Sequence, residues 1–344
     1  MMVEEIRGAG MFSIQIDTTQ DINVHDQCSI VIRYVTDTVH ERLITIVNCT
    51  STTGKRMCDL VCGVFEKLGI DVSKYIDNST DGASNMQGQY NGFNAWLNTV
   101  SPGQIHVWCY AHVLNLVMGD ITKKAVEVVT LFGVLNTCAV FLRESYLRFN
   151  VWREFSKLKY ISVIGETRWW AKDRALTKIF GNFFKPSNQE THIIDFLYVD
   201  MLQTFHDIST SNRFNNDVRY RAKSLLDSLT NFEFILTAQL FLKIFEHTTP
   251  LSEYLQTTGM DLLRAYKMVQ NCINELSKVD RNFDPIFQAA INFSKFANNE
   301  LEKRNLDIEV QMVLKEKRII ANQLFESAKD KFCQCSQHGY GSSN

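Results

Sequence analysis

The chain has 344 residues, and a usual size of roughly 100–200 residues per domain predicts about two domains. Hydrophobic residues make up 45% and charged residues 22%, which is typical of a globular protein and excludes a largely disordered chain. Lys and Arg total 36 against 38 Asp and Glu. The resulting net charge of −2 excludes a strongly basic nucleic-acid module over the whole chain, although not a local basic patch.

The sequence predicts an intracellular protein, nuclear or cytoplasmic, that is not held in a membrane. No uninterrupted apolar run reaches the roughly 18–20 residues that a membrane span needs. The first ten residues contain Glu4 and Glu5 and have no apolar core of a secretory signal. The 9 Cys are an odd number scattered over a long chain, which indicates reduced thiols.

Three strands are predicted at the start of the chain. Residues 12–18 alternate between apolar and polar side chains, which is the period of a strand with one buried face. Residues 27–36 and 41–50 are rich in β-branched residues and follow after short connections, so the three strands are expected to form an antiparallel meander.

The next elements alternate between helix and strand. Residues 55–69 have an apolar stripe at helical spacing and end at Gly69, a common residue just past a helix. Short strands are expected near residues 75–80 and 105–109. The predicted order is therefore βββαβ(α)β.

The remainder of the chain has helical periodicity. An apolar stripe at three- to four-residue steps begins at Val128 and runs to Tyr146, and from about residue 171 almost everything is predicted to be helical. A helix-packing seam is expected at Leu262, Tyr266, Val269, Ile273 and Leu276.

Two aspartates are the first candidate site residues. Asp17 ends the first strand, and Asp81 follows the fourth strand in the run STDGASNM. Each alone is compatible with a bland role, Asp17 on a solvated strand face and Asp81 in a turn. In a βββαβ sheet the fourth strand pairs beside the first, so the two carboxylates together could hold divalent metal for phosphodiester chemistry.

Two further motifs have weaker chemical meaning. Cys109 and His112 form a CxxH motif after the fifth strand, but structural zinc needs two more ligands, so a buried thiol and a hydrogen-bonding histidine are the simpler interpretation. Arg168 and Trp169 suit phosphate contact and base stacking, and also suit ordinary packing. The Cys333/Cys335/His338 group is a weak metal motif in a predicted tail.

These motifs, in this order, resemble the transposase domain of the hAT superfamily. The resemblance rests on FSIQIDTT, STDGASNMQG, IHVWCYAHVLNL and TRWW, and is greatest to the zinc finger MYM-type protein 1-like and TTF-type zinc finger group. It implies an α+β fold with an RNase H-like core at residues 8–170, an all-helical insertion domain at 171–332 and a tail at 333–344.

The resemblance also implies site roles. Asp17 and Asp81 match the first two acids of a DDE triad that binds Mg²⁺ or Mn²⁺ and cuts and joins DNA. Cys109 and His112 match a supporting C/H motif, and Arg168 with Trp169 matches an element that contacts DNA at the cut end.

The third acid of the triad is not found in the sequence. Glutamates are available after the predicted insertion, but none has the expected context: Glu300, Glu302, Glu309, Glu316 and Glu326. The family's dimerisation domain and N-terminal zinc finger are also not recognised. The expectation is therefore a truncated, transposon-derived protein that holds metal weakly or not at all and does not cleave DNA.

Two alternatives stay open at this point. One is an active transposase or nuclease on an incomplete gene model. The other is a domesticated module that binds proteins in transcription through its helical half. DNA ends and protein partners are both possible ligands, and self-association is left open because the dimerisation domain is not recognised.

Overall fold

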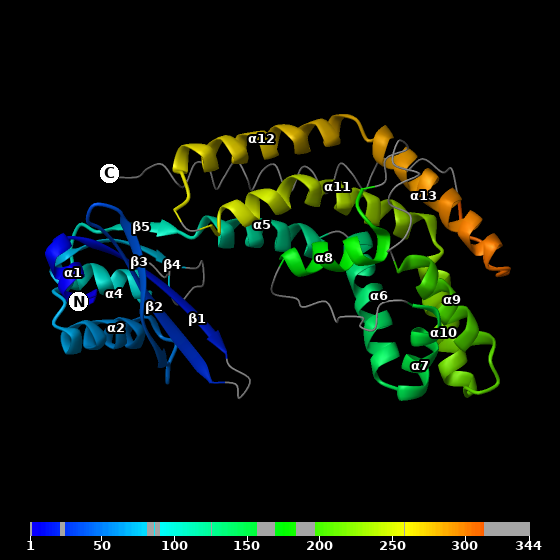
Figure 1. Cartoon of the computed structure of the whole chain (residues 1–344), viewed down its shortest axis with the longest axis horizontal. Helices are drawn as coiled ribbons and strands as arrows, with labels where there is room; N and C mark the ends of the chain where they lie inside the picture. Colours follow the sequence, from blue (N-terminus) through cyan, green and yellow to red (C-terminus); the bar gives the residue numbers. More distant parts are fainter. Residues whose placement is uncertain are drawn as a thin grey trace. The chain divides into compact units, whose positions relative to one another are not determined.

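The computed structural model describes residues 2–20, 25–80, 86, 90–124, 126–156, 169–183, 197–257 and 259–312. The described residues form two compact units, one within Met1–Leu114 and one that begins at Asn115. The helix α5 (Tyr110–Lys124) starts in the first unit and continues into the second (Figure 1). The boundary expected at residue 170 comes from the family resemblance. The division into compact units does not test it, so it stays a prediction.

The first unit contains a five-stranded mixed sheet in the order β3-β2-β1-β4-β5. The antiparallel pairs β1–β2 and β2–β3 confirm the predicted meander, and β4 and β5 add in parallel beside β1. The predicted α+β class is therefore confirmed. The strands are β1 (Phe12–Gln20), β2 (Asp26–Val35), β3 (Val39–Asn48), β4 (Tyr75–Thr80) and β5 (Ile105–Trp108).

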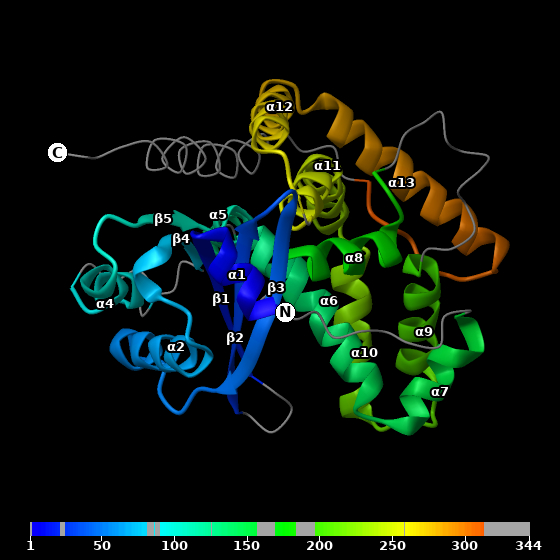
Figure 2. The same ribbon diagram turned by 60° about the vertical axis from the view of Figure 1, so that its left-hand side comes forward.

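One face of this sheet forms the core of the first unit. The alternation predicted for β1 buries Phe12, Ile14 and Ile16, which pack in one apolar cluster with side chains of three helices. These three helices are α1 (Met2–Ala9), α2 (Gly54–Leu68) and α4 (Phe93–Val100), and a short 3₁₀ helix (Val72–Lys74) precedes β4. Figure 2 shows α2 and α4 side by side against the sheet.

The end of α2 shows how local sequence and distant contacts cooperate. Gly69 has a φ of 63°, in the left-handed region, as expected of a glycine just past a helix. Arg7 of α1 donates from Nε to the Gly69 carbonyl at 2.9 Å and from Nη2 to the Leu68 carbonyl at 2.7 Å. The guanidinium group thus satisfies carbonyls that the helix itself leaves without partners.

The second unit is helical in all its described elements. α11 lies at its centre and contacts five others: α6, α8, α10, α12 and α13. The helices are α6 (Val126–Arg143), α7 (Tyr146–Phe155), α8 (Trp169–Phe180), α9 (Tyr198–Thr210), α10 (Asn216–Leu229), α11 (Phe232–Tyr254), α12 (Leu262–Arg281) and α13 (Asp284–Lys303).

Aromatic rings join four of these helices in the core of the second unit. Phe180 of α8 contacts Tyr198, Phe234 and Phe293, with ring centroids 5.2–6.2 Å apart. The buried Tyr198 hydroxyl donates to the Leu229 carbonyl at 2.8 Å, so this ring adds no unsatisfied polar group to the core.

Among the described helices, α6 is long and apolar enough to cross a membrane by length and composition. Its buried side chains, however, belong to the core of the second unit, where α6 contacts α7, α10 and α11. A core helix satisfies the same test, and core packing accounts for the apolar residues that α6 buries.

Two predicted helix faces are partly wrong. The stripe that begins at Val128 is buried as expected, but Tyr146 is 74% exposed because α6 ends at Arg143 and a new helix begins. In α12, Leu262 and Tyr266 of the predicted seam are exposed, Val269 and Ile273 are half-buried, and Leu276 is buried as predicted. The other buried apolar side chains described in this helix are Ala265, Cys272 and Val279.

Candidate functional site

Asp17 lies on the face of the sheet that faces away from α2 and the core. Its position follows from strand alternation, because Phe12, Ile14 and Ile16 take the buried face. The Asp17 side chain is exposed, and it pairs across the strands with Ser29, whose hydroxyl donates to the Asp17 carbonyl at 3.1 Å. The Asp17 side chain is therefore exposed at the surface of the sheet.

The strand that precedes Asp81 is the direct neighbour of β1. β4 runs parallel to β1, with Gln15 opposite Ser79, so the carboxyl ends of both strands reach the same edge of the sheet. This adjacency is what the predicted two-acid site requires. Asp81 itself lies outside the described residues, so its pairing with Asp17 stays a prediction.

Cys109 is fixed at the end of β4 by the backbone. Its N–H donates to the Thr80 carbonyl at 3.1 Å, and its own carbonyl accepts from the Val113 N–H at 2.9 Å as α5 begins. His112 lies in the first turn of α5, and both side chains are half-buried. The structure thus places Cys109 at the edge where β4 ends. The supporting role expected of Cys109 at the active site stays a prediction.

The described structure does not test the remaining predicted site residues against this edge. Arg168 lies outside the described residues, and of Trp169 only the backbone, at the start of α8 in the second unit, is described. Their role in DNA contact stays a prediction.

The described structure does not establish any of the glutamates named above as the third acid. Glu300 forms an ion pair with Lys303 at 2.6 Å on α13, and Glu302 and Glu309 are exposed. Glu316 and Glu326 lie outside the described residues. Within the described part of the chain, no three His, Cys, Asp or Glu side chains gather closely enough to hold a metal ion. The described residues therefore do not complete a centre for Mg²⁺ or Mn²⁺.

A buried polar network lies on the opposite, core face of β4 and β5. Asn78 donates from Nδ2 to Gln104 Oε1 at 2.6 Å and to the Tyr75 hydroxyl, which in turn donates to Gln104. Asn78 Oδ1 lies 2.5 Å from His106 Nδ1, and burial lowers the pKa of His106. This network was not predicted from the sequence, where the only signal for it is the presence of polar residues at core positions of two short strands.

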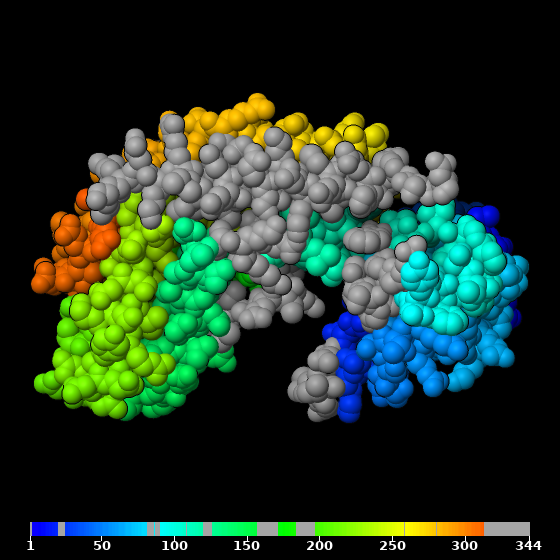
Figure 3. Space-filling view, turned by 180° about the vertical axis from the view of Figure 1, so that it is seen from behind, coloured from blue at the N-terminus to red at the C-terminus, as the bar shows by residue number. Residues whose placement is uncertain are grey.

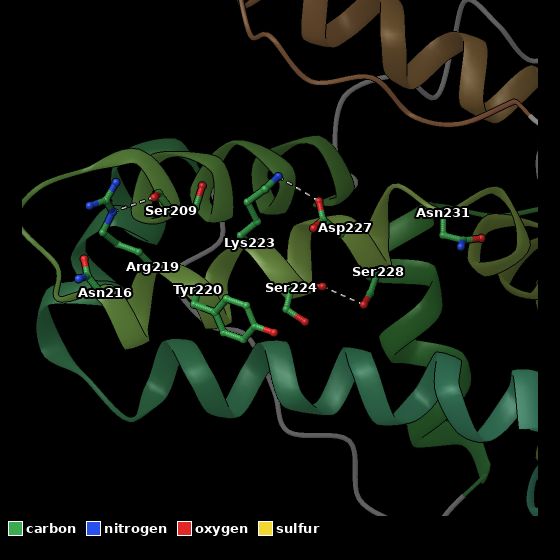
Figure 4. A pocket seen from close by; sticks show the side chains of 9 residues that line it. All are labelled: Ser209, Asn216, Arg219, Tyr220, Lys223, Ser224, Asp227, Ser228 and Asn231. Carbon is green, nitrogen blue, oxygen red and sulfur yellow. Dashed lines mark hydrogen bonds and ion pairs between the residues drawn. The ribbon is translucent and has the colours of Figure 1, made fainter.

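A second candidate surface is a cavity of about 710 Å³ along the outer face of α10. Figure 4 shows polar side chains along successive turns of the helix, among them Arg219, Tyr220 and Lys223. Arg219 Nε donates to the Ser209 carbonyl at 3.0 Å, and Lys223 pairs with Asp227 at 3.3 Å. α9 and α10 lie side by side, and Figure 3 shows their green to yellow-green surface with no other element over it in that view.

The start of the chain matches a family model. Residues 1–92 match the family model DUF4371, described as "ZMYM1/FAM200, RNase-like domain". Over these residues the first unit is similar to an RNase-like domain, and we call it the RNase-like unit. The matched stretch contains β1 to β4 and Asp17, so the sheet edge described above lies within it.

Proposed function

We propose that this chain is a transposase-derived protein of the hAT type that keeps the RNase-like fold and does not cleave DNA by itself. The match of residues 1–92 to a ZMYM1/FAM200 RNase-like domain carries the proposal. The parallel pairing of β1 with β4 and the exposed Asp17 carboxylate support it, because this is where the first two acids are expected to meet.

Cleavage of DNA by an RNase-like unit would require bound divalent metal. Phosphodiester transfer of this type uses divalent metals that several carboxylates hold and orient. Asp17 and Asp81 are the two carboxylates expected here, and no glutamate of the sequence has the context expected of the third. We therefore assign no reaction step to the RNase-like unit and expect at most weak binding of Mg²⁺ or Mn²⁺.

A strand-transfer assay on labelled DNA ends, with Mg²⁺ or Mn²⁺, tests this proposal. The expected result is no cutting or joining above background. The matched variants are Asp17→Ala and Asp37→Ala, since Asp37 is another exposed aspartate of the same unit. Cutting by the wild type that Asp17→Ala abolishes and Asp37→Ala preserves would overturn the proposal in favour of an active nuclease.

The helical unit supports a second candidate function, the binding of a partner. The observation that favours it is the polar cavity along α10, where Arg219 and Lys223 lie one turn apart. DNA and an acidic protein surface would both suit these cations, and salt dependence separates them. DNA binding should weaken steeply with salt, by a slope of about 0.7–0.9 per phosphate contact on logarithmic axes.

The test is DNA binding by the full chain at several salt concentrations. Arg219→Ala with Lys223→Ala removes two charges from the cavity, and Lys278→Ala with Lys303→Ala removes two exposed charges elsewhere in the same unit. A salt slope reduced only by the first pair supports DNA at this surface. No binding, or equal effects of both pairs, leaves protein contact as the function of the helical unit.

A further inference from the structure

Two thiols lie side by side on α2 of the RNase-like unit. Cys58 and Cys62 are four residues apart, so they occupy the same face of the helix in successive turns. Their sulfur atoms are 4.0 Å apart, and both are free thiols. Neither residue belongs to the sheet edge that carries Asp17.

The two thiols differ in their surroundings. Cys58 is 4% exposed and packs in the core beneath the helix, whereas Cys62 is half-buried at the rim of the same cluster. The core therefore covers the pair on the side of Cys58, and the partial exposure of Cys62 gives solvent access on the other side.

The contact between the two sulfur atoms places two metal-binding groups within reach of one ion. A thiolate is the form of cysteine that binds metals and reacts with electrophiles. A monovalent cation bound between the sulfurs would compensate the charge of one of the two thiolates.

We propose that Cys58 and Cys62 form a two-sulfur binding site for a soft monovalent cation of the cuprous type. Soft thiolate ligands select such ions over hard divalent cations. With metal–sulfur bonds of about 2.3 Å, as in thiolate sites, one ion can contact both sulfurs at their present separation. Both thiols lose a proton on binding, which leaves a bis-thiolate complex with one negative charge.

Zinc fits this pair less well. Structural zinc takes four ligands, and within the described residues no group of three or more His, Cys, Asp or Glu side chains surrounds the pair. A cation that is satisfied by two sulfurs needs nothing more than the pair supplies. The site is independent of the proposed function, since it uses neither DNA nor the predicted acids.

The experiment measures alkylation of each cysteine of the full chain by iodoacetamide and mass spectrometry, with and without Cu(I) buffered by bicinchoninate under anaerobic conditions. We expect Cu(I) to slow the alkylation of Cys62 by about ten-fold or more, because a metal-bound thiolate is not a free nucleophile. Cys109, a half-buried thiol outside the pair, serves as the internal reference and should keep its rate.

The Cys58→Ala variant distinguishes a two-sulfur site from a single reactive thiol. Its Cys62 should lose the protection by Cu(I), whereas Cys272→Ala, which removes a buried thiol of α12, should retain it. Protection of Cys62 that persists in Cys58→Ala, or no protection in the wild type, would overturn the proposal.

A second measurement covers the case in which Cys58→Ala does not fold. Cys62→Ser changes a thiol at the rim of the core, and its Cu(I) capacity is compared with that of Cys272→Ser by competition with bicinchoninate. The proposal predicts one fewer bound ion for Cys62→Ser alone. Equal capacities would refute it, and thiols elsewhere in the chain contribute equally to both variants.

Discussion

The side chain of Asn298 on α13 brackets the backbone of Val310. Asn298 Nδ2 donates to the Val310 carbonyl at 3.1 Å, and Asn298 Oδ1 accepts from the Val310 N–H at 2.8 Å. Val310 is fully buried, and the next residue, Gln311, donates its N–H to the Thr230 carbonyl at 2.9 Å. The Asn298 side chain thus makes the pair of hydrogen bonds that a neighbouring strand would make to Val310. These bonds hold the segment after α13 against the helical unit.

Asn298→Ala should lower the free energy of unfolding of the helical unit by about 2–3 kcal/mol, because two buried backbone groups lose their partners. Urea unfolding followed by circular dichroism measures the change. Asn299→Ala, at the exposed next position of α13, is the control and should stay within about 0.5 kcal/mol of the wild type. Equal losses in both variants would contradict the bracketing role of Asn298.

Gly54 is required where α2 begins against α4. A Cβ at this position would lie 2.4 Å from the Asn91 carbonyl oxygen and 2.4 Å from the Phe93 nitrogen, both of which are backbone atoms. Gly54→Ala should therefore destabilise the RNase-like unit by about 1–3 kcal/mol, as overpacking does. Thermal unfolding measures the effect.

Gly63→Ala provides the matched control in the same helix. Because its Cβ would meet nothing within 4 Å, the substitution should stabilise α2 by about 0.5–1 kcal/mol through the better helix propensity of alanine. If Gly54→Ala also stabilised the unit, helix propensity rather than the contact at the start of α4 would govern Gly54.

The sequence predicted those parts of the fold that are determined by local pattern. The alternation around Ile14 identified β1 and its buried face, and Gly69 identified the end of α2, because both signals are contained within a few residues. The helix α1 was not predicted. It is eight residues long and depends on distant partners, namely Arg7 on the end of α2 and Glu5, which accepts from the Tyr34 hydroxyl at 2.8 Å.

The candidate site could be predicted only in part, for a related reason. Strand order brings β4 beside β1, so the edge that carries Asp17 follows from the predicted topology. The polar network around Asn78 could not be found, since it depends on which face of two short parallel strands is covered by α4. In α12, only part of the predicted seam is buried, because periodicity fixes the spacing of a stripe, whereas the contact with α11 selects which side chains are buried.

Glu144 at the end of α6 holds two arginines over one aromatic ring. Its Oε2 lies 3.4 Å from Arg148 Nη2 and 3.5 Å from Arg221 Nη2, and both guanidinium groups lie over the ring of Phe141. Arg148 is only 7% exposed, and its Nε and Nη1 have no partner among the described residues. Glu144 is thus the carboxylate that offsets a buried charge.

Glu144→Gln should destabilise the helical unit by about 1–3 kcal/mol, because it leaves a buried guanidinium without its counter-charge. The control is Asp227→Asn, which breaks an exposed pair with Lys223 and should cost less than about 1 kcal/mol. Chemical unfolding of both variants gives the comparison. A smaller loss in Glu144→Gln than in Asp227→Asn would show that the ring contacts alone stabilise Arg148.

His106 should make the stability of the RNase-like unit depend on pH. Since Asn78 Nδ2 donates to Gln104, Asn78 Oδ1 is left to accept from His106 Nδ1, and His106 Nε2 is buried without a partner among the described residues. Burial lowers the pKa of His106 below its ordinary value of about 6.5. Below that value the unfolded chain binds a proton that the folded unit does not, so stability is complete above about pH 6.5 and declines as the pH falls.

Unfolding in urea at about pH 7.5 and at about pH 5.5 tests this expectation for the wild type and His106→Gln, two conditions on either side of the ordinary histidine pKa. The variant should lose less stability between the two conditions than the wild type does, because it has no imidazole to protonate. His40→Gln, which replaces a half-buried histidine of β3 in the same unit, is the control for the loss of an imidazole elsewhere. If His106→Gln lost as much stability at low pH as the wild type, the acid sensitivity would arise outside the Tyr75–Asn78–Gln104 network.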